Sequence, residues 1–228
     1  VGESVVVQTR DPSGIVTAFS SMARFPTQAD HDEGHLLFHV QAPAGLACAS
    51  CHPDGREDGR VWHFLPDGPR RTQSLAGGVL QTAPFHWDGT LDTTDALMRE
   101  VLVKRMGAQQ PSGTQVAQLG AWLDTIKRSA ARGAELALAE RGKVLFESAA
   151  VGCAACHLGP HLTNNANADV GTGRQFQVPS LVGLSARAPF MHDGCATTLE
   201  GGGGAGCGGG GGGGVTSSLS APQVADLV

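Results

Sequence analysis

The sequence repeats itself at an offset of a little over one hundred residues. Five blocks occur twice in the same order, which is far beyond chance. The paired blocks are 33–38 with 141–146, 48–52 with 153–157, 74–75 with 180–181, 83–89 with 188–194, and 115–119 with 223–227. An internal repeat constrains the architecture before any single element is assigned, and this one predicts two tandem domains. We place them at 29–132 and 133–228, after an N-terminal extension over 1–28.

Apolar residues in each predicted domain recur three and four positions apart, which is typical of short helices. The pattern covers 31–39 in the first domain and 135–147 in the second. The clearest helix is predicted over 114–128, where Thr114 would be the N-cap and one apolar stripe follows it. Its counterpart is expected to start near Ser220 and to be cut short at the end of the chain. The fold is therefore expected to be mainly α.

The first 28 residues differ in character and form a short β-like extension. Their pattern predicts a strand around 5–7, a turn over 11–14 and a second strand over 15–19. Since a lone hairpin is marginally stable in water, we expect it to belong to a larger β-domain upstream or to pair with a partner.

Charge and hydropathy narrow the function classes. The formal net charge is −5 and the isoelectric point is about 6.0, which argues against a nucleic-acid partner or an anionic membrane surface. No apolar run approaches the roughly 20 residues that a transmembrane helix needs. The chain opens with Val1-Gly2-Glu3, so no signal peptide is visible. We expect that one was removed by processing or that the sequence begins inside a longer protein.

Each predicted domain carries one Cys-x-x-Cys-His motif. Two thiols at this spacing can add to the two vinyl groups of a haem, and the following histidine is then placed to bind the iron. A structural zinc site would need four ligands, and a thioredoxin-like motif would need a βαβ setting that is absent here. We therefore predict two c-type haems and two tandem cytochrome c domains. The attachment residues are Cys48, Cys51 and His52 for one haem, and Cys153, Cys156 and His157 for the other.

Two cysteines remain outside the motifs, Cys195 and Cys207. Haem attachment of this kind takes place outside the reducing cytosol, where disulfides also persist. The sequence therefore predicts a Cys195–Cys207 disulfide and a periplasmic or otherwise extracytoplasmic location. Two free thiols are the alternative.

The second axial ligand decides how a haem iron reacts, because methionine raises the redox potential, histidine lowers it, and an open position permits chemistry with small oxygen species. In the first domain Met106, in a hydrophilic loop before the 114–128 helix, is the preferred candidate, and His63 is the alternative. In the second domain Met191 and His192 belong to a block that is shared by both domains, which favours a structural role for them.

The position that matches Met106 in the second domain falls at 212–214, inside a glycine-rich stretch over 201–214. Taken literally, this stretch is a flexible linker. We favour the interpretation that glycine stands in for side chains that were not assigned, so that the second distal ligand is not visible in the sequence.

Taken together, these motifs resemble the bacterial di-haem cytochrome c peroxidases and their relatives, including the di-haem enzyme of methylamine utilisation. The resemblance covers about residues 30–228. It is strongest to the subgroup in which a di-haem module follows a β-propeller, which would account for the strand-like N-terminus. It rests on the two haem motifs and on the segments Gly68-Pro69-Arg70, Ser74-Leu75, Phe85-His86-Trp87-Asp88-Gly89, Val178-Pro179-Ser180-Leu181 and Ala188-Pro189-Phe190-Met191-His192-Asp193-Gly194.

The resemblance implies roles for individual residues. Trp87 matches the tryptophan that lies between the two haems and would be an electron relay. His63 stands at the spacing of the movable distal histidine, and Met106 resembles the methionine ligand of the high-potential haem, although that methionine normally follows the second motif. Asp95 is a weak counterpart of the acidic residue near the peroxide site. Calcium between the domains is usual in the family, but the sequence shows no convincing ligand set for it.

Three functions compete at this point. The first is electron transfer alone, with a redox protein partner or within a larger electron-transfer assembly. The second is an enzyme of the cytochrome c peroxidase type that reduces hydrogen peroxide with electrons from an external donor. The third is a sensor or assembly module with structural haems. Met106 favours the first, Trp87 and the resemblance favour the second, and whether the chain is an enzyme stays open.

Overall fold

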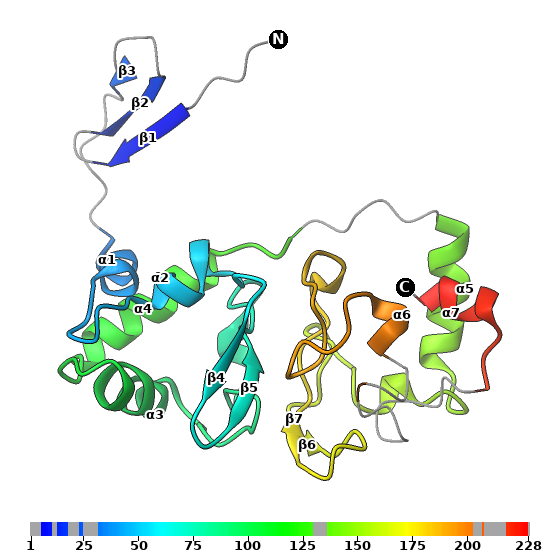
Figure 1. Ribbon diagram of the computed structural model, residues 1–228. Coiled ribbons are helices and arrows are strands. Elements are labelled where there is room, and N and C mark those ends of the chain that lie inside the picture. Colours follow the sequence, from blue (N-terminus) through cyan, green and yellow to red (C-terminus); the bar gives the residue numbers. More distant parts are fainter. Residues whose placement is uncertain are drawn as a thin grey trace.

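The computed structural model describes residues 6–10, 13–17, 23–24, 32–129, 136–202, 207 and 218–227. Among these, helical residues outnumber strand residues. The two repeats lie side by side, with two short hairpins facing each other between them (Figure 1). No helix in the described part of the chain is long and apolar enough to cross a membrane.

The N-terminal strands form an antiparallel sheet in the order β1-β2-β3. Their bounds are Val6–Arg10, Ser13–Thr17 and Ala23–Arg24. The first two strands pair through a tight connection, with Arg10 opposite Ser13. The third strand is not visible in the sequence pattern, because two residues carry no periodicity.

In the first repeat, helix α1 (Glu33–His39) packs against helix α4 (Gly113–Thr125). The prediction that Thr114 caps the second of these helices is wrong. The N-cap is Ser112, whose hydroxyl accepts from the Gln115 N–H at 3.3 Å while the Gln115 side chain accepts from the Ser112 N–H at 2.9 Å. This reciprocal pair satisfies two N–H groups that would otherwise be orphaned, and it starts the helix earlier than the apolar stripe alone suggests.

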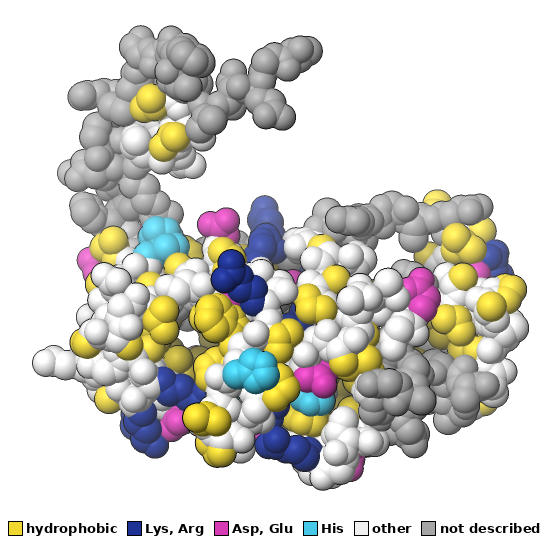
Figure 2. Space-filling model, in the orientation of Figure 1, with side chains coloured by type: hydrophobic (Ala, Val, Ile, Leu, Met, Phe, Trp, Pro, Cys, Tyr) yellow, Lys and Arg dark blue, Asp and Glu magenta, His cyan; other side chains and the backbone are white. Residues whose placement is uncertain are grey.

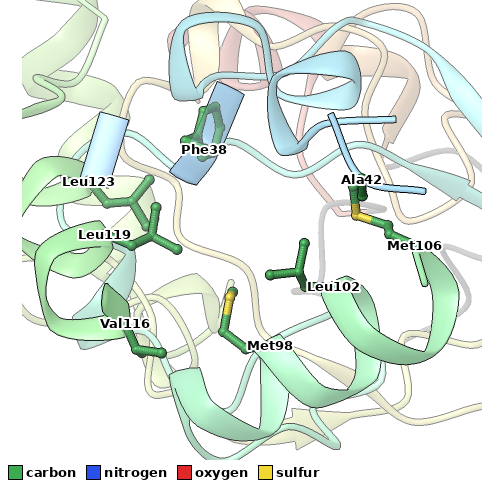
Figure 3. Close-up of a cluster of buried hydrophobic side chains, with 8 residues drawn as sticks. All are labelled: Phe38, Ala42, Met98, Leu102, Met106, Val116, Leu119 and Leu123. Atoms are coloured by element: carbon green, nitrogen blue, oxygen red, sulfur yellow. The ribbon is translucent and has the colours of Figure 1, made fainter. Parts of the chain in front are cut away.

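Between these helices, α3 (Thr94–Leu97) continues into a π-helix, η3 (Met98–Arg105). The expected loop position of Met106 agrees with the structure, where it lies in the turn before 107–112, but the expected hydrophilic setting is wrong. Met106 caps the π-helix and is only 6% exposed. It belongs to a cluster of buried apolar side chains that encircle a common interior (Figure 3). The cluster consists of Phe38, Ala42, Met98, Leu102, Met106, Val116, Leu119 and Leu123.

The second repeat reproduces the helix pair with α5 (Leu136–Glu147) and α7 (Ala221–Leu227). A bidentate ion pair joins them, with Arg141 donating to both carboxylate oxygens of Asp226 at 3.0 and 2.7 Å. The remaining helical turns are short: α2 (Cys48–Cys51), η1 (Pro53–Gly55), η2 (Val79–Gln81), η4 (Cys153–Ala155), η5 (Leu184–Ala186) and α6 (Leu199–Gly202).

Two hairpins that the sequence analysis did not predict lie where the repeats meet (Figure 1). In the first repeat, β4 (Val61–Phe64) pairs with β5 (Gly68–Arg71). In the second, β6 (Asn167–Ala168) pairs with β7 (Phe176–Gln177). Short strands interrupted by proline and glycine leave no alternating pattern, which is why the sequence did not reveal them.

One glycine in each repeat allows its helix pair to approach closely. Gly34 on α1 and Gly142 on α5 occupy matching positions of the repeat. A Cβ on Gly34 would overlap the carbonyl oxygen of Gln118, and a Cβ on Gly142 would overlap that of Asp226. Backbone therefore meets backbone at the same point in both repeats, which explains why glycine stands there.

We predict that Gly34→Ala lowers the free energy of unfolding by ~1–3 kcal/mol, because the new methyl group must push α4 away. Urea unfolding followed by circular dichroism measures this change. Gly113→Ala is the matched control, since a Cβ there meets no atom within 4 Å, and its effect should stay within about 0.5 kcal/mol. Equal stability of both variants with the parent protein would contradict the close helix approach.

Candidate functional site

The first Cys-x-x-Cys-His motif forms helix α2, and His52 is its C-cap. The Nδ1 of His52 lies 3.2 Å from the carbonyl oxygen of Arg56. A carbonyl can only accept, so Nδ1 carries the proton and Nε2 keeps its lone pair. Burial lowers the pKa of His52, which keeps the ring neutral. A neutral imidazole oriented by its Nδ1–H is the form in which histidine binds a metal.

In the second motif the histidine Nδ1 also has a backbone carbonyl as its partner, but that carbonyl lies five residues further along the chain instead of four. The Nδ1 of His157 lies 3.0 Å from the carbonyl oxygen of Leu162, and burial lowers the pKa of this histidine too. Both rings also have a backbone carbonyl acceptor at matching places, that of Gln73 and that of Pro179, just before the repeated Ser-Leu pair; these carbonyls raise the pKa of each histidine but do not offset burial. The repeat therefore conserves the orientation of the histidine as well as the motif.

The four motif cysteines are not joined in disulfides. Burial raises the pKa of Cys48, Cys51 and Cys153, so these are neutral thiols at neutral pH. Neutral thiols can add to vinyl groups. In the described part of the chain, no group of three or more His, Cys, Asp or Glu side chains is arranged to hold a metal ion.

A cavity of about 980 Å³ opens beside the first motif, with Cys48, Cys51 and His52 on its wall. This volume is at the upper end of the range for small-molecule sites. Apolar side chains from the buried cluster line one part, and the second repeat contributes Pro179 and Arg187 to another. A deep apolar space with two thiols, an oriented imidazole and cationic groups fits a haem.

The structure separates the two distal candidates of the first repeat. Met106 lines the cavity, and so does Met98, which points into the interior of the cluster (Figure 3). His63 is exposed on β4, opposite Pro69, and is not among the residues that line the cavity. Asp95, the weak acidic counterpart, is also exposed, where it pairs with Arg99 and accepts from Gln110 at 3.0 Å. Met98 is a competitor that the sequence analysis did not consider.

The sequence analysis also passed over His86, which lines the cavity together with His52. His86 has a φ of 66°, and Met191 at the matching position of the second repeat has a φ of 69°. Non-glycine residues rarely adopt this left-handed conformation, and when they do a functional constraint is a common reason. Burial, and then the charge of Arg105, lower the pKa of His86, so the ring is neutral. The shared block was the available signal, but apart from Trp87 it was interpreted as structural.

Trp87 follows His86 and lies at the contact between the repeats. It is 7% exposed, lines the cavity, and donates from Nε1 to the carbonyl oxygen of Arg71 at 2.7 Å. Its ring meets that of His192 edge to face, with the ring centres 6.4 Å apart. His192 in turn stacks on Phe176 at 4.0 Å. A continuous set of aromatic rings therefore crosses from one repeat to the other.

Two backbone hydrogen bonds tie the repeats together at matching positions. The Arg71 N–H donates to the carbonyl oxygen of His192 at 2.7 Å, and the Gln177 N–H donates to that of Trp87 at 2.8 Å. Arg71 matches Gln177 in the repeat, and Trp87 matches His192. Each hairpin thus holds the turn of the other repeat, and the contact has an approximate two-fold symmetry.

In the second repeat, Cys195 and Cys207 form a disulfide with their Cα atoms 5.6 Å apart. Of the glycine-rich stretch 201–214, only Gly201, Gly202 and Cys207 are described. The position that matches Met106, at 212–214, lies outside the described residues. Our interpretation of the glycines therefore stays a prediction from the sequence, and the structure does not describe the position expected for the second distal ligand.

Comparison with known proteins gives one curated relative and several similar folds. No protein family model matches the chain. The methylamine utilization protein MauG of Methylorubrum extorquens is 29% identical over an alignment that covers 73% of this chain and 65% of MauG. The chain thus spans about two thirds of the length of this relative.

Three solved structures share the fold at low sequence identity. A chain of hydrazine synthase from Kuenenia stuttgartiensis has a TM-score of 0.74 and 20% identity, with 85% of this chain and 83% of that chain covered. A MauG-like protein associated with microbial copper homeostasis has a TM-score of 0.63 and 19% identity, with 87% of each chain covered. The diheme peroxidase BthA from Burkholderia thailandensis has a TM-score of 0.50 and 18% identity, with 86% and 76% covered.

These likenesses agree with one another and with the two Cys-x-x-Cys-His motifs. The chain is therefore similar, in sequence and in fold, to the superfamily of di-haem cytochrome c peroxidases and MauG, and the resemblance predicted from its motifs is confirmed.

Proposed function

We propose that this protein is a di-haem c-type oxidoreductase that transfers electrons between two covalently bound haems through Trp87. The proposal takes 29–132 and 133–228 as the two cytochrome c domains. The observation that carries it is the position of Trp87, which is buried, lines the first cavity and meets His192 of the other repeat. Similarity to MauG and to the diheme peroxidase BthA supports it.

The chain would hold each haem at three points. Cys48 and Cys51 would form the thioethers of the first haem and Cys153 and Cys156 those of the second, with His52 and His157 on the iron. The hydrogen bonds from Nδ1 to Arg56 and to Leu162 fix the ring that each histidine presents. Haem iron supplies one-electron redox chemistry once it is bound.

Trp87 would provide the coupling between the two sites. Its hydrogen bond to Arg71 and its edge-to-face contact with His192 hold the indole in one orientation. Fixed geometry matters here because a relay that moved would change the coupling from moment to moment. The protein side of the mechanism is therefore the exclusion of water and the rigid placement of these rings.

Compartment and partner follow from the same features. The Cys195–Cys207 bridge supports an extracytoplasmic, for example periplasmic, location, because disulfides persist in oxidising environments. A redox protein or a larger assembly would supply or accept the electrons. On the face shown in Figure 2, basic side chains are interspersed with acidic and apolar ones. Calcium is not part of the proposal.

Peroxide reduction is the second candidate function, and His86 is the observation that favours it. A neutral histidine on the cavity wall can accept a proton from one peroxide oxygen and return it to the other, as general acid–base catalysis requires. The net reaction takes two electrons and two protons and gives two water molecules. The electrons would come from the external donor by way of the second haem.

Electron transfer is tested by Trp87→Phe, which removes the indole N–H and shortens the ring system. We expect electron exchange between the haems to slow by at least about tenfold, equivalent to ~1.4 kcal/mol of barrier. Reduction of one haem by a flash-generated donor, followed at the absorption bands of both, measures this rate.

Trp122→Phe is the matched control, because Trp122 packs on Phe38 and does not line the cavity. Its exchange rate should equal that of the parent protein. Mass spectrometry must first show two haems per chain in all three proteins. An unaltered rate in Trp87→Phe would remove Trp87 from the path, and a chain without haem would defeat the whole proposal.

Distal ligation is tested by Met106→Leu. If Met106 binds the iron, its loss should lower the midpoint potential of one haem by on the order of 0.1 V, within the ~0.8 V that axial ligands span. Met98→Leu is the control, since Met98 is equally buried in the same cluster. Spectroelectrochemical titration separates the two. A fall in Met98→Leu alone would assign the ligand to Met98.

Peroxide chemistry is tested by His86→Gln, which keeps a polar side chain but loses the base. If the second candidate function holds, the rate at which peroxide oxidises the reduced protein should fall by ~10²–10⁴-fold. Stopped-flow absorbance measures the rate, and His39→Gln, on the exposed end of α1, should leave it unaltered. If peroxide leaves the parent spectrum unaltered, electron transfer alone stands.

A further inference from the structure

Two arginine side chains, one from each repeat, are buried at the wall of the cavity beside the first motif. Arg71, at the end of β5, is 3% exposed, and Arg187, just after η5, is 7% exposed. The Arg71 Nη1 donates to the carbonyl oxygen of Arg187 at 2.7 Å. The Arg187 Nη1 donates to the carbonyl oxygens of Ser180 at 2.9 Å and Val182 at 3.2 Å.

The charges at this place do not balance within the described part of the chain. The carboxylate of Glu57, a partly buried residue, lies 3.5 Å from the Nε of Arg187 and pairs with it. No carboxylate of a described residue lies within 4.0 Å of Arg71, and its Nε is buried without a hydrogen-bond partner. A buried cation with no counter-ion costs several kcal/mol. Two guanidinium groups therefore share one carboxylate, and one negative charge is missing.

The protonation of Arg71 reflects the same imbalance. Burial, and then the charge of Arg187, lower the pKa of Arg71 to about 10. The side chain is still charged at neutral pH, so the missing anion has a cation to meet. A planar guanidinium group binds a carboxylate through two parallel hydrogen bonds, which is the geometry that an unpartnered Nε offers.

The cavity itself indicates which anion belongs there. Arg71 and Arg187 line the same space as Cys48, Cys51 and His52. Haem carries its two carboxylates on the ring edge opposite the vinyl groups that cysteines take. A haem held by the two thiols would thus bring its carboxylates into the same space that the two arginines line. No separate anion needs to enter.

We propose that Arg71 and Arg187 bind a carboxylate of the haem attached at Cys48 and Cys51, which rests on the proposed function. Because Arg187 belongs to the second repeat, this carboxylate joins the two repeats through the cofactor. The arginines are positioning residues that also set the potential of the first haem. Their positive charge opposes that of the oxidised iron, so they favour the reduced form.

The test uses the holo-protein with Arg71→Gln and Arg187→Gln. We expect the midpoint potential of one haem to fall in both variants while that of the other haem stays constant. The resonance Raman bending band of the haem carboxylate, which responds to hydrogen bonding, should shift with it. Arg71→Lys keeps the charge and should recover most of the potential but not the Raman band.

Arg70→Gln is the matched control. Arg70 lines the same cavity and, as Arg71 does with Trp87, lies over an aromatic ring, that of Phe176. It differs from Arg71 in its charged surroundings, because burial lowers its pKa but the carboxylates of Asp67, Asp88 and Asp193 act to raise it. The Arg70→Gln substitution removes the same charge as Arg71→Gln, but from a residue that is not proposed to hydrogen-bond the haem carboxylate. The Raman band should therefore not shift. Equal effects of Arg70→Gln and Arg71→Gln on the Raman band would overturn the proposal, as would parent-like potentials in both test variants.

The outcomes also separate this inference from the function beneath it. Loss of haem from the parent chain would defeat the proposed function, whereas two attached haems with unaltered potentials would defeat the arginine site alone. A parent potential that follows the concentration of inorganic phosphate at constant ionic strength would show a free anion on the arginines and overturn the carboxylate assignment. If Arg71→Gln does not fold, Arg187→Gln decides.

Discussion

The exchange of two backbone hydrogen bonds between the repeats is the constraint on which the rest of this structure depends. Arg71 holds His192, and Gln177 holds Trp87. These bonds are short, and they lie beside buried aromatic rings, where water cannot compete for the same groups. Because they fix each hairpin against the opposite turn, they place Trp87 between the repeats and bring Arg187 to the wall of a cavity that belongs mostly to the first repeat.

Much of the fold could be predicted from the sequence because the repeat doubles every signal. Helices α1, α4, α5 and α7 lie close to the expected segments, and the motif histidines have matching surroundings. The prediction of element boundaries failed where the structure depends on specific hydrogen bonds between residues rather than on periodic spacing of apolar residues. The capping box of Ser112 and Gln115 displaced the expected start of α4, and the π-helix before Met106 has no periodic signature that distinguishes it from a loop.

The residues of the candidate site likewise fall into two groups, those that local sequence spacing predicts and those that only the tertiary fold brings together. The proposed haem-attachment residues are predicted from spacing alone, because that chemistry requires the two cysteines and the histidine within five consecutive positions. His86, Met98, Arg71 and Arg187 come together only through the tertiary fold, so no local pattern points to them. His86 and Met191 come nearest to a sequence signal, since they occupy one position of a repeated block, but their left-handed backbone becomes visible only in three dimensions.

The approximate two-fold contact has a consequence for how such a chain could arise and work. Two identical copies of one ancestral unit would meet in this way as an isologous dimer, each offering the other the same turn and the same hairpin. Fusion into a single chain releases the halves from identity. At one pair of matching positions the first repeat has Trp87 and the second has His192, and at another the first has Arg71 and the second has Gln177. A symmetric dimer presents two identical halves, whereas these paired differences make the two sides of the contact chemically distinct.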